Sequence, residues 1–195
     1  MSITVINPNS NEAVTKGLRD TLTGFPNVTC LTLTEGPFGI ESQRDSDAVI
    51  QPMLDLMRAT PEASAFVIAC YSDPGLDAAR SVSSVPVFGI QEAGLATALC
   101  CADMFGVIAI GEPSILRHRK YMRRMGVLER LAGERALNMS VDETARGANT
   151  FNRLKTVGAD LIADGAGCLI LGCAGMARHR APLEKHLAVP VIDPT

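Results

Sequence analysis

Short apolar runs alternate with amphipathic segments of helical length along the whole chain. In the first half, the apolar runs predict strands at residues 3–6, 28–33, 66–70 and 85–90. The amphipathic segments predict helices at residues 11–23, 45–59 and 91–102. The run at 66–70 is apolar on both faces, which is typical of a central strand in a parallel sheet. Strands that alternate with helices in this way predict an α/β protein.

Polar residues before three of the segments predict where helices begin. Ser10 is expected to cap the first helix, and Asp45 or Ser46 the second. Asp73 followed by Pro74 predicts a third helix start, because proline fits the first turn of a helix.

The same order of elements begins again in the second half. Strands are expected at residues 105–110, 136–139, 167–173 and 189–192. Helices are expected at residues 114–124, 150–164 and 177–187. The helix at 114–124 is strongly basic and is expected to present a solvated face, with His118 on the surface.

Three anchors indicate that the two halves are an internal repeat. Ile6-Asn7-Pro8-Asn9-Ser10 aligns with Ile110-Gly111-Glu112-Pro113-Ser114, Val85-Pro86-Val87 aligns with Val189-Pro190-Val191, and Cys70 aligns with Cys173. We therefore predict two pseudo-symmetric lobes, residues 1–103 and 104–195, each a four-stranded parallel sheet flanked by helices, with the active site between them. The first half has a helix after its fourth strand, so an equivalent C-terminal helix is expected beyond residue 195.

Composition narrows the classes of function. The 195 residues carry 18 basic and 21 acidic side chains, a net charge of −3, which argues against nucleic acid or a membrane surface as a partner. Aromatic residues make up only 4%, without tryptophan, so stacking platforms for single-stranded nucleic acid are not expected. The sequence has neither an apolar run of membrane-spanning length nor the pattern of a signal peptide. A cytoplasmic protein with a small-molecule ligand is expected.

Six cysteines carry the candidate chemistry: Cys30, Cys70, Cys100, Cys101, Cys168 and Cys173. A disulfide framework is not expected in an unsecreted chain of this size. The sequence has no CxxC pair, no metal spacing among its histidines and no phosphate-binding glycine motif, so no metal or cofactor is predicted. Cys30, Cys100, Cys101 and Cys168 are interpreted as reduced, buried and inert.

Cys70 and Cys173 occupy equivalent positions, each at the end of the third strand of its half and before a helix. Ligands of open α/β sheets bind at the carboxyl ends of the strands, where helix N-termini offer unpaired N–H groups. A thiol placed there can have its pKa lowered from about 8.5 into the range of roughly 3.5–7.5. The turns Tyr71-Ser72 and Ala174-Gly175 can direct backbone N–H groups at an oxyanion.

Two such thiols on opposite sides of one cleft suit inversion of a stereocentre. One thiolate removes a proton from one face of the carbon, and the opposing thiol delivers a proton to the other face. No cofactor is required, and each positioned acid or base typically contributes about 10²–10⁴ in rate.

The residues around both cysteines resemble a known family. Ala69-Cys70-Tyr71-Ser72-Asp73-Pro74-Gly75 is similar to the first cysteine motif of the hydantoin and allantoin racemases, and Leu171-Gly172-Cys173-Ala174-Gly175 is similar to their second. The resemblance spans essentially the whole chain and implies the aspartate/glutamate racemase superfamily, whose members perform cofactor-independent two-cysteine racemisation between two α/β lobes. By that resemblance Cys70 and Cys173 are the catalytic acid/base pair.

The resemblance also implies where the substrate binds. The expected substrate-binding residues are Asn7, Tyr71, Ser72, Gly111, Glu112, Gly172, Ala174 and Gly175. Gly111 and Glu112 stand where the hydantoin-type enzymes commonly carry a threonine-rich turn, which is a departure from the family pattern. Glu112 at the site would disfavour an anionic substrate such as aspartate and would disfavour a neutral cyclic ureide less. A homo-oligomer is expected, because dimers are the commonest assembly of such enzymes.

The leading hypothesis is therefore a racemase acting at an acidic carbon beside a carbonyl, with a hydantoin or allantoin as substrate. Two alternatives stay open. The same scaffold could carry a decarboxylase or a cis–trans isomerase that uses cysteine, or it could be a non-catalytic protein that binds a small molecule. A covalent adduct on one cysteine would favour the isomerase, and two ordinary thiols would favour simple binding.

Overall fold

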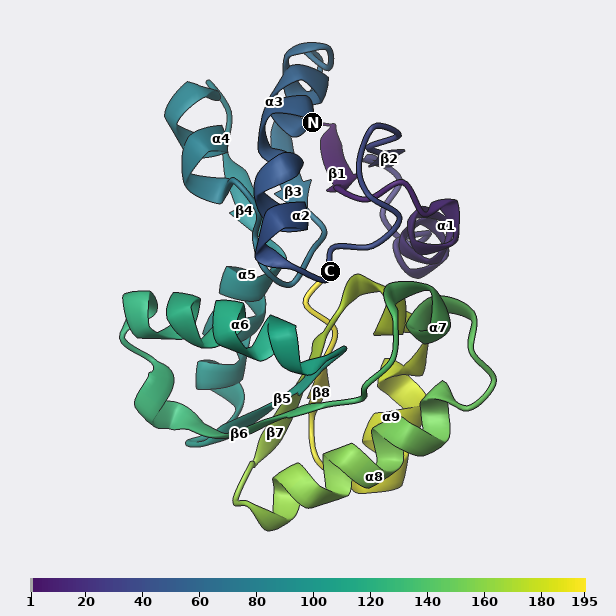
Figure 1. Ribbon diagram of the computed structural model, residues 1–195, viewed down its shortest axis with the longest axis vertical. Coiled ribbons are helices and arrows are strands. Elements are labelled where there is room, and N and C mark those ends of the chain that lie inside the picture. Colours follow the sequence, from purple (N-terminus) through teal and green to yellow (C-terminus); the bar gives the residue numbers. More distant parts are fainter. Residues whose placement is uncertain (1) are drawn as a thin grey trace.

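Two four-stranded parallel sheets, one from each half of the chain, form two lobes stacked along the long axis of the molecule (Figure 1). The computed structural model describes residues 2–195. The elements of the first half are β1 (Ile3–Asn7), α1 (Glu12–Thr21), β2 (Val28–Thr32), α2 (Gln43–Ala48), α3 (Ile50–Arg58), β3 (Ala65–Ile68), α4 (Leu76–Val82), β4 (Val87–Gly89) and α5 (Ile90–Cys101). Those of the second half are β5 (Phe105–Ala109), α6 (Glu112–Met125), the 3-10 helix η1 (Leu128–Arg130), β6 (Leu131–Ala136), α7 (Val141–Arg146), α8 (Thr150–Ala163), β7 (Cys168–Gly172), the 3-10 helix η2 (Ala174–His179), α9 (Arg180–Leu187) and β8 (Val191–Ile192).

The two sheets have the same strand order, β2-β1-β3-β4 and β6-β5-β7-β8, and every pairing in them is parallel. All residues of the central strands β5 and β7 are buried, as the apolar runs predict. This confirms the predicted α/β class with two pseudo-symmetric parallel sheets. Because β3 and β7 are equivalent central strands, their carboxyl ends occupy equivalent places in the two lobes.

Strands β5 and β7 approach so closely at Gly172 that a side chain does not fit there. A Cβ at this position would lie 2.7 Å from the carbonyl oxygen of Ile108 on β5. The glycine therefore lets β7 remain paired with β5 up to the residue before Cys173.

Two helices of the first half pack across to the second lobe. Helix α5 directly follows β4 and packs on β7 and β8. A Cβ at Gly94 would lie 2.9 Å from Cβ of Pro194 and 3.3 Å from Cγ2 of Ile170, which shows how close α5 comes to the second sheet. Helix α1 packs on α7 and η2. One apolar cluster therefore runs through both lobes, while the first lobe has a second cluster of its own. Helix α5 belongs by packing to the second sheet although it precedes the boundary predicted after residue 103.

Helix boundaries in the first half differ from the prediction because other polar side chains provide the caps. Asn11, rather than Ser10, caps α1. Ser42 caps α2 in a capping box with Asp45. The predicted single helix over residues 45–59 is two helices, α2 and α3, which meet at Val49. None of the helices within residues 2–195 is long and apolar enough to span a membrane.

The predicted role of Asp73 as the cap of the next helix is wrong. Helix α4 begins only at Leu76, after Gly75 at φ 68°. Asp73 adopts φ 43° and turns its carboxylate toward α5, where it accepts the N–H groups of Gln91 and Glu92 at 2.9 Å each. The loop after β3 is thereby tied to the helix that packs on the second lobe.

Strand β6 lies earlier than predicted, ending at Ala136 rather than running over residues 136–139. Its buried Glu134 breaks the apolar pattern from which strands are predicted. Helix α7 was not predicted, although Ser140 and Glu143 form a capping box at its start. The Ser-x-x-Glu spacing is the signal that could have found it.

Candidate active site

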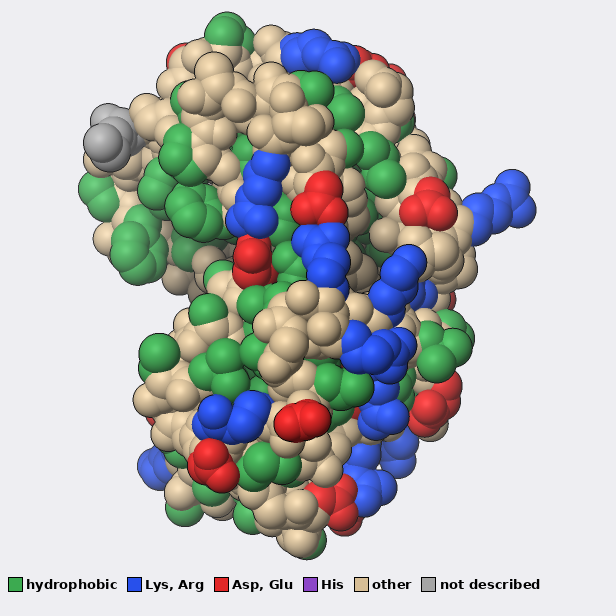
Figure 2. All heavy atoms as spheres, turned by 90° about the vertical axis from the view of Figure 1, so that its left-hand side faces the viewer, with side chains coloured by type: hydrophobic (Ala, Val, Ile, Leu, Met, Phe, Trp, Pro, Cys, Tyr) green, Lys and Arg blue, Asp and Glu red, His purple; other side chains and the backbone are tan. Residues whose placement is uncertain are grey.

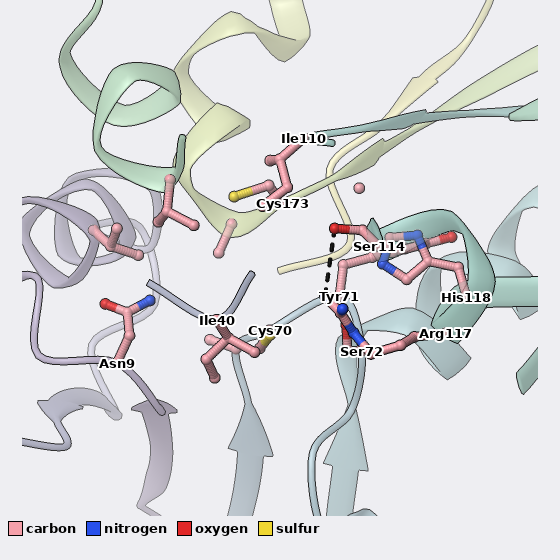
Figure 3. A pocket seen from close by; sticks show the side chains of 15 residues that line it. Asn9, Ile40, Cys70, Tyr71, Ser72, Ile110, Ser114, Arg117, His118 and Cys173 are labelled. Atoms are coloured by element: carbon pink, nitrogen blue, oxygen red, sulfur yellow. Dashed lines mark hydrogen bonds between the residues drawn. The ribbon is translucent and has the colours of Figure 1, made fainter. Parts of the chain in front are cut away.

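A small pocket lies between the lobes at the carboxyl ends of β3 and β7 (Figure 3). Cys70 follows β3, Cys173 follows β7, and the two side chains enter the pocket from opposite sides. The free space inside is about 30 Å³, room for roughly two or three water molecules. The structure therefore shows the pocket in a closed form.

Burial raises the pKa of both thiols. It raises the pKa of Cys70 to about 12, and the negative charge of an ionised Cys173 adds to this rise. Burial also raises the pKa of Cys173 above its ordinary value. The backbone N–H groups of Ser72 and Gly175 donate to the two sulfurs and oppose these shifts without overcoming them.

The prediction of lowered thiol pKa values is therefore wrong for the closed pocket. A helix N-terminus directly after each cysteine would lower its pKa. Helix α4 starts six residues after Cys70, at Leu76, and Cys173 is followed by the short 3-10 helix η2. Loss of hydration by burial between two lobes outweighs the remaining dipoles.

The structure brings six of the predicted site residues together. Those that line the pocket are Cys70, Tyr71, Ser72, Gly172, Cys173 and Ala174. Gly175 contributes through its backbone N–H to Cys173. Gly111 and Glu112, at the start of α6, do not line the pocket, and Glu112 is exposed.

Asn7, the last residue of β1, is fully buried. Its Nδ2 donates to Oδ1 of Asn9 at 3.1 Å, to the carbonyl of Asn11 at 3.2 Å and to Oγ1 of Thr15 at 3.0 Å. These bonds hold the turn between β1 and α1, and Asn9 in that turn lines the pocket. In this structure Asn7 shapes the wall of the pocket and does not line it.

Three side chains of α6 line the pocket although they were not predicted as site residues: Ser114, Arg117 and His118. They recur at a spacing of three and four residues, which places them on one helix face. That spacing was visible in the sequence, but the charges around it indicated a solvated helix.

His118 is buried, with 1% of its surface exposed, so the prediction of a surface position is wrong. Its Nδ1 lies 2.5 Å from Oε1 of Glu134 on β6. Its ring packs edge-on against Tyr71, with ring centroids 4.9 Å apart. This buried pair with the adjacent tyrosine forms a polar wall behind the pocket.

Arg117 connects the two lobes. Its guanidinium donates to the carbonyl of Pro113 and the hydroxyl of Ser114 on its own helix. It also donates to the carbonyl of Glu41 at 3.2 Å and to Oγ of Ser72 at 3.5 Å, both in the first lobe. Arg117 makes no ion pair within residues 2–195. The pocket is thus bordered by a half-buried positive charge, although burial lowers the pKa of Arg117.

The remaining cysteines lie outside the pocket. Cys30 and Cys168 are buried as predicted, whereas Cys100 and Cys101 are exposed on α5, contrary to the prediction. Across residues 2–195, no group of three or more His, Cys, Asp or Glu side chains is arranged to hold a metal ion.

Comparison with known proteins identifies the relatives of the chain. The family described as Asp/Glu/Hydantoin racemase matches residues 3–195. The chain is 34% identical to a hydantoin racemase of Paenarthrobacter aurescens (100% of this chain, 86% of the relative) and 34% identical to a hydantoin racemase of Pseudomonas sp. strain NS671 (99% and 81%). Its structure is similar to an allantoin racemase from Klebsiella pneumoniae, with a TM-score of 0.92 at 29% identity, over 100% of this chain and 82% of that one. The chain therefore belongs to the Asp/Glu/Hydantoin racemase family and is an isomerase of the racemase type.

Proposed function

We propose that the chain racemises a hydantoin-type substrate, a five-membered cyclic ureide, by proton transfer between Cys70 and Cys173 and without a cofactor. The observation that carries this proposal is the position of the two thiols on opposite sides of one pocket between the lobes (Figure 3). The names of the relatives, hydantoin racemase and allantoin racemase, support this class of substrate.

The ring stereocentre of a hydantoin lies beside a carbonyl group, which makes its hydrogen acidic. One sulfur, as thiolate, takes this proton, and the electron pair of the broken C–H bond passes to the carbonyl oxygen as an enolate. The opposite thiol donates its proton to the other face of the carbon. After one turnover the two sulfurs have exchanged protonation states, so the enzyme is ready for the opposite enantiomer.

The surroundings of the thiols suit a weakly acidic substrate. A thiolate with a raised pKa is a stronger base than an ordinary cysteine, although less of it is present at neutral pH. The backbone N–H groups of Ser72 and Gly175 donate to the two sulfurs and stabilise each thiolate as it forms. Oγ1 of Thr144, 3.8 Å from Sγ of Cys173, adds a further polar contact on that side.

A hydantoin ring does not fit into a free space of about 30 Å³. Substrate access therefore requires the lobes to move apart, as is common for enzymes that close around their substrates. Polar contacts that cross the boundary between the lobes, such as Nδ2 of Asn11 with Oδ1 of Asp142 at 3.0 Å and Oε1 of Glu41 with the N–H of Val141 at 3.1 Å, would open in that movement.

The test incubates single enantiomers of hydantoins and of allantoin with the protein in deuterium oxide. We expect optical rotation to be lost as one deuterium enters the stereocentre. Cys70→Ser and Cys173→Ser should each lose at least about 10²-fold in racemisation, because each removes one acid or base. Cys100→Ser is the control, since Cys100 is exposed and outside the pocket.

Each serine variant is also expected to retain some deuterium exchange from only one enantiomer, the one whose proton faces the remaining cysteine. Full racemisation by either variant would contradict the two-thiol mechanism. Absence of exchange with every hydantoin, with allantoin and with amino acids would contradict racemisation of these substrates.

A further inference from the structure

A second cleft lies beside the thiol pocket on the face of the molecule that carries α6. Its free volume is about 180 Å³, and it shares Ser72 and Arg117 with the thiol pocket. Helices α2 and α3 and the loop after β3 line it on the first lobe, and α6 lines it on the second lobe. A substituent on a ring held between the thiols could therefore extend into this cleft.

The α6 wall of the cleft is positively charged. Arg117, Lys120 and Arg124 line it, at spacings of three and four residues that place them on one helix face. Arg124 is paired with Asp77. Within residues 2–195, Arg117 and Lys120 make no ion pair. Figure 2 shows lysine and arginine side chains gathered on this face near the boundary between the lobes.

The carboxylates that line the same cleft make no ion pair with these two cations. Asp73 is held by the N–H groups at the start of α5. Asp47, on α2, accepts from Nε2 of Gln43 at 2.8 Å. Glu112, which was expected to repel an anionic substrate, lines neither the pocket nor the cleft. Asp45 acts on Arg117 through its charge but forms no ion pair with it. Arg117 and Lys120 are therefore open to a negative group, whereas the sequence suggested that Glu112 would repel one.

We propose that this cleft binds the ring substituent of the substrate and favours a substituent that ends in a carboxylate. The inference rests on the proposed function, because it places the ring in the thiol pocket. Arg117 suits this role because its present bonds are 3.2–3.5 Å long and end on uncharged oxygens. A carboxylate forms shorter, charge-assisted bonds to guanidinium and can displace them. Lys120, exposed at the rim, adds a second positive charge.

The test compares two hydantoins of the same shape. The hydantoin of glutamate ends in a carboxylate, and the hydantoin of glutamine ends in a neutral amide. We expect kcat/KM to be about tenfold higher for the carboxylate, equivalent to about 1.4 kcal/mol and typical of one charge-assisted hydrogen bond. Lys120→Gln should lower this preference, and Lys120→Glu should abolish it. Added salt should reduce it as well, because Lys120 is exposed.

Lys185→Gln is the matched control, because Lys185 is an exposed lysine on α9 outside both the pocket and the cleft. It should leave the preference unchanged. Equal kcat/KM values for the two hydantoins, or a preference for the amide, would overturn the carboxylate subsite and leave the proposed racemisation standing. Racemisation of neither hydantoin, nor of any other, would overturn both.

Discussion

Replacing Gly172 with alanine tests the link between the packing of the second sheet and the position of Cys173. The new Cβ would lie 2.7 Å from the carbonyl oxygen of Ile108 and 3.3 Å from Cγ1 of Val107. The first of these neighbours is the backbone of a buried central strand, which cannot turn aside as a flexible side chain can. Strands β5 and β7 must separate by several tenths of an ångström or the end of β7 must turn.

Overpacking of this kind typically costs 1–3 kcal/mol. Because the clash is with backbone, we expect Gly172→Ala to lower the free energy of unfolding by about 2–3 kcal/mol. For a protein of this length each kcal/mol corresponds to roughly 2–4 °C, so Tm should fall by roughly 4–12 °C. A displacement of the adjacent sulfur approaching 1 Å would lower kcat/KM by about 10²-fold.

Urea denaturation followed by circular dichroism measures the stability, and polarimetry measures racemisation. Gly17→Ala is the control: Gly17 is in α1, and a Cβ there meets nothing within 4 Å. That variant should gain about 0.5–1 kcal/mol, because alanine favours the helix. If Gly172→Ala were as stable and as active as the unaltered protein, the close approach of β5 and β7 would not be what requires glycine before Cys173.

Three further predictions concern single side chains. Burial raises the pKa of Asp73 to about 7, so its carboxyl ionises less readily in the folded than in the unfolded state. The free energy of unfolding should therefore fall as the pH rises from about 4 to 7. Asp73→Asn should flatten this dependence on pH. Only thiolate reacts with iodoacetamide, and the pKa of Cys70 is raised to about 12. At pH 8 the reagent should therefore modify the exposed Cys100, while peptide mapping finds Cys70, which is partly accessible, unmodified. Comparable rates would contradict the raised pKa of Cys70. Glu134→Ala leaves the buried His118 without its partner at 2.5 Å. It should lower the free energy of unfolding, measured by urea denaturation, by about 3 kcal/mol. Glu134→Gln keeps a polar partner and should lower it by less than half as much.

The features that the sequence predicts well are those expressed in local pattern or in the repeat. The alignment of Cys70 with Cys173 predicts that both follow equivalent strands, and the structure places both in one pocket. The apolar runs predict the buried central strands β5 and β7. Each of these inferences needs only the order and spacing of residues.

The features that the local sequence pattern does not predict depend on contacts with residues distant in the chain. Asp73 caps a helix that begins 17 residues later, so no local signature distinguishes it from the cap of its own helix. His118 belongs to a basic stretch, and its burial is explained only by its hydrogen bond with Glu134 on β6. The direction of the thiol pKa shifts follows from how tightly the lobes close on Cys70, which depends on tertiary packing.

The packing of α5 on the second sheet has a consequence for synthesis of the protein on the ribosome. Helix α5 buries Ile90, Leu95 and Ala98 and packs on the second sheet. Strand β7 of that sheet is synthesised about 70 residues after α5, which at common translation rates is roughly 4–14 s later. During that interval the nascent first half can pair its four strands, but the apolar face of α5 has no surface to cover it. The half-made chain should therefore attract chaperones and aggregate readily, and the two halves should fold together, despite their likeness, as one cooperative unit.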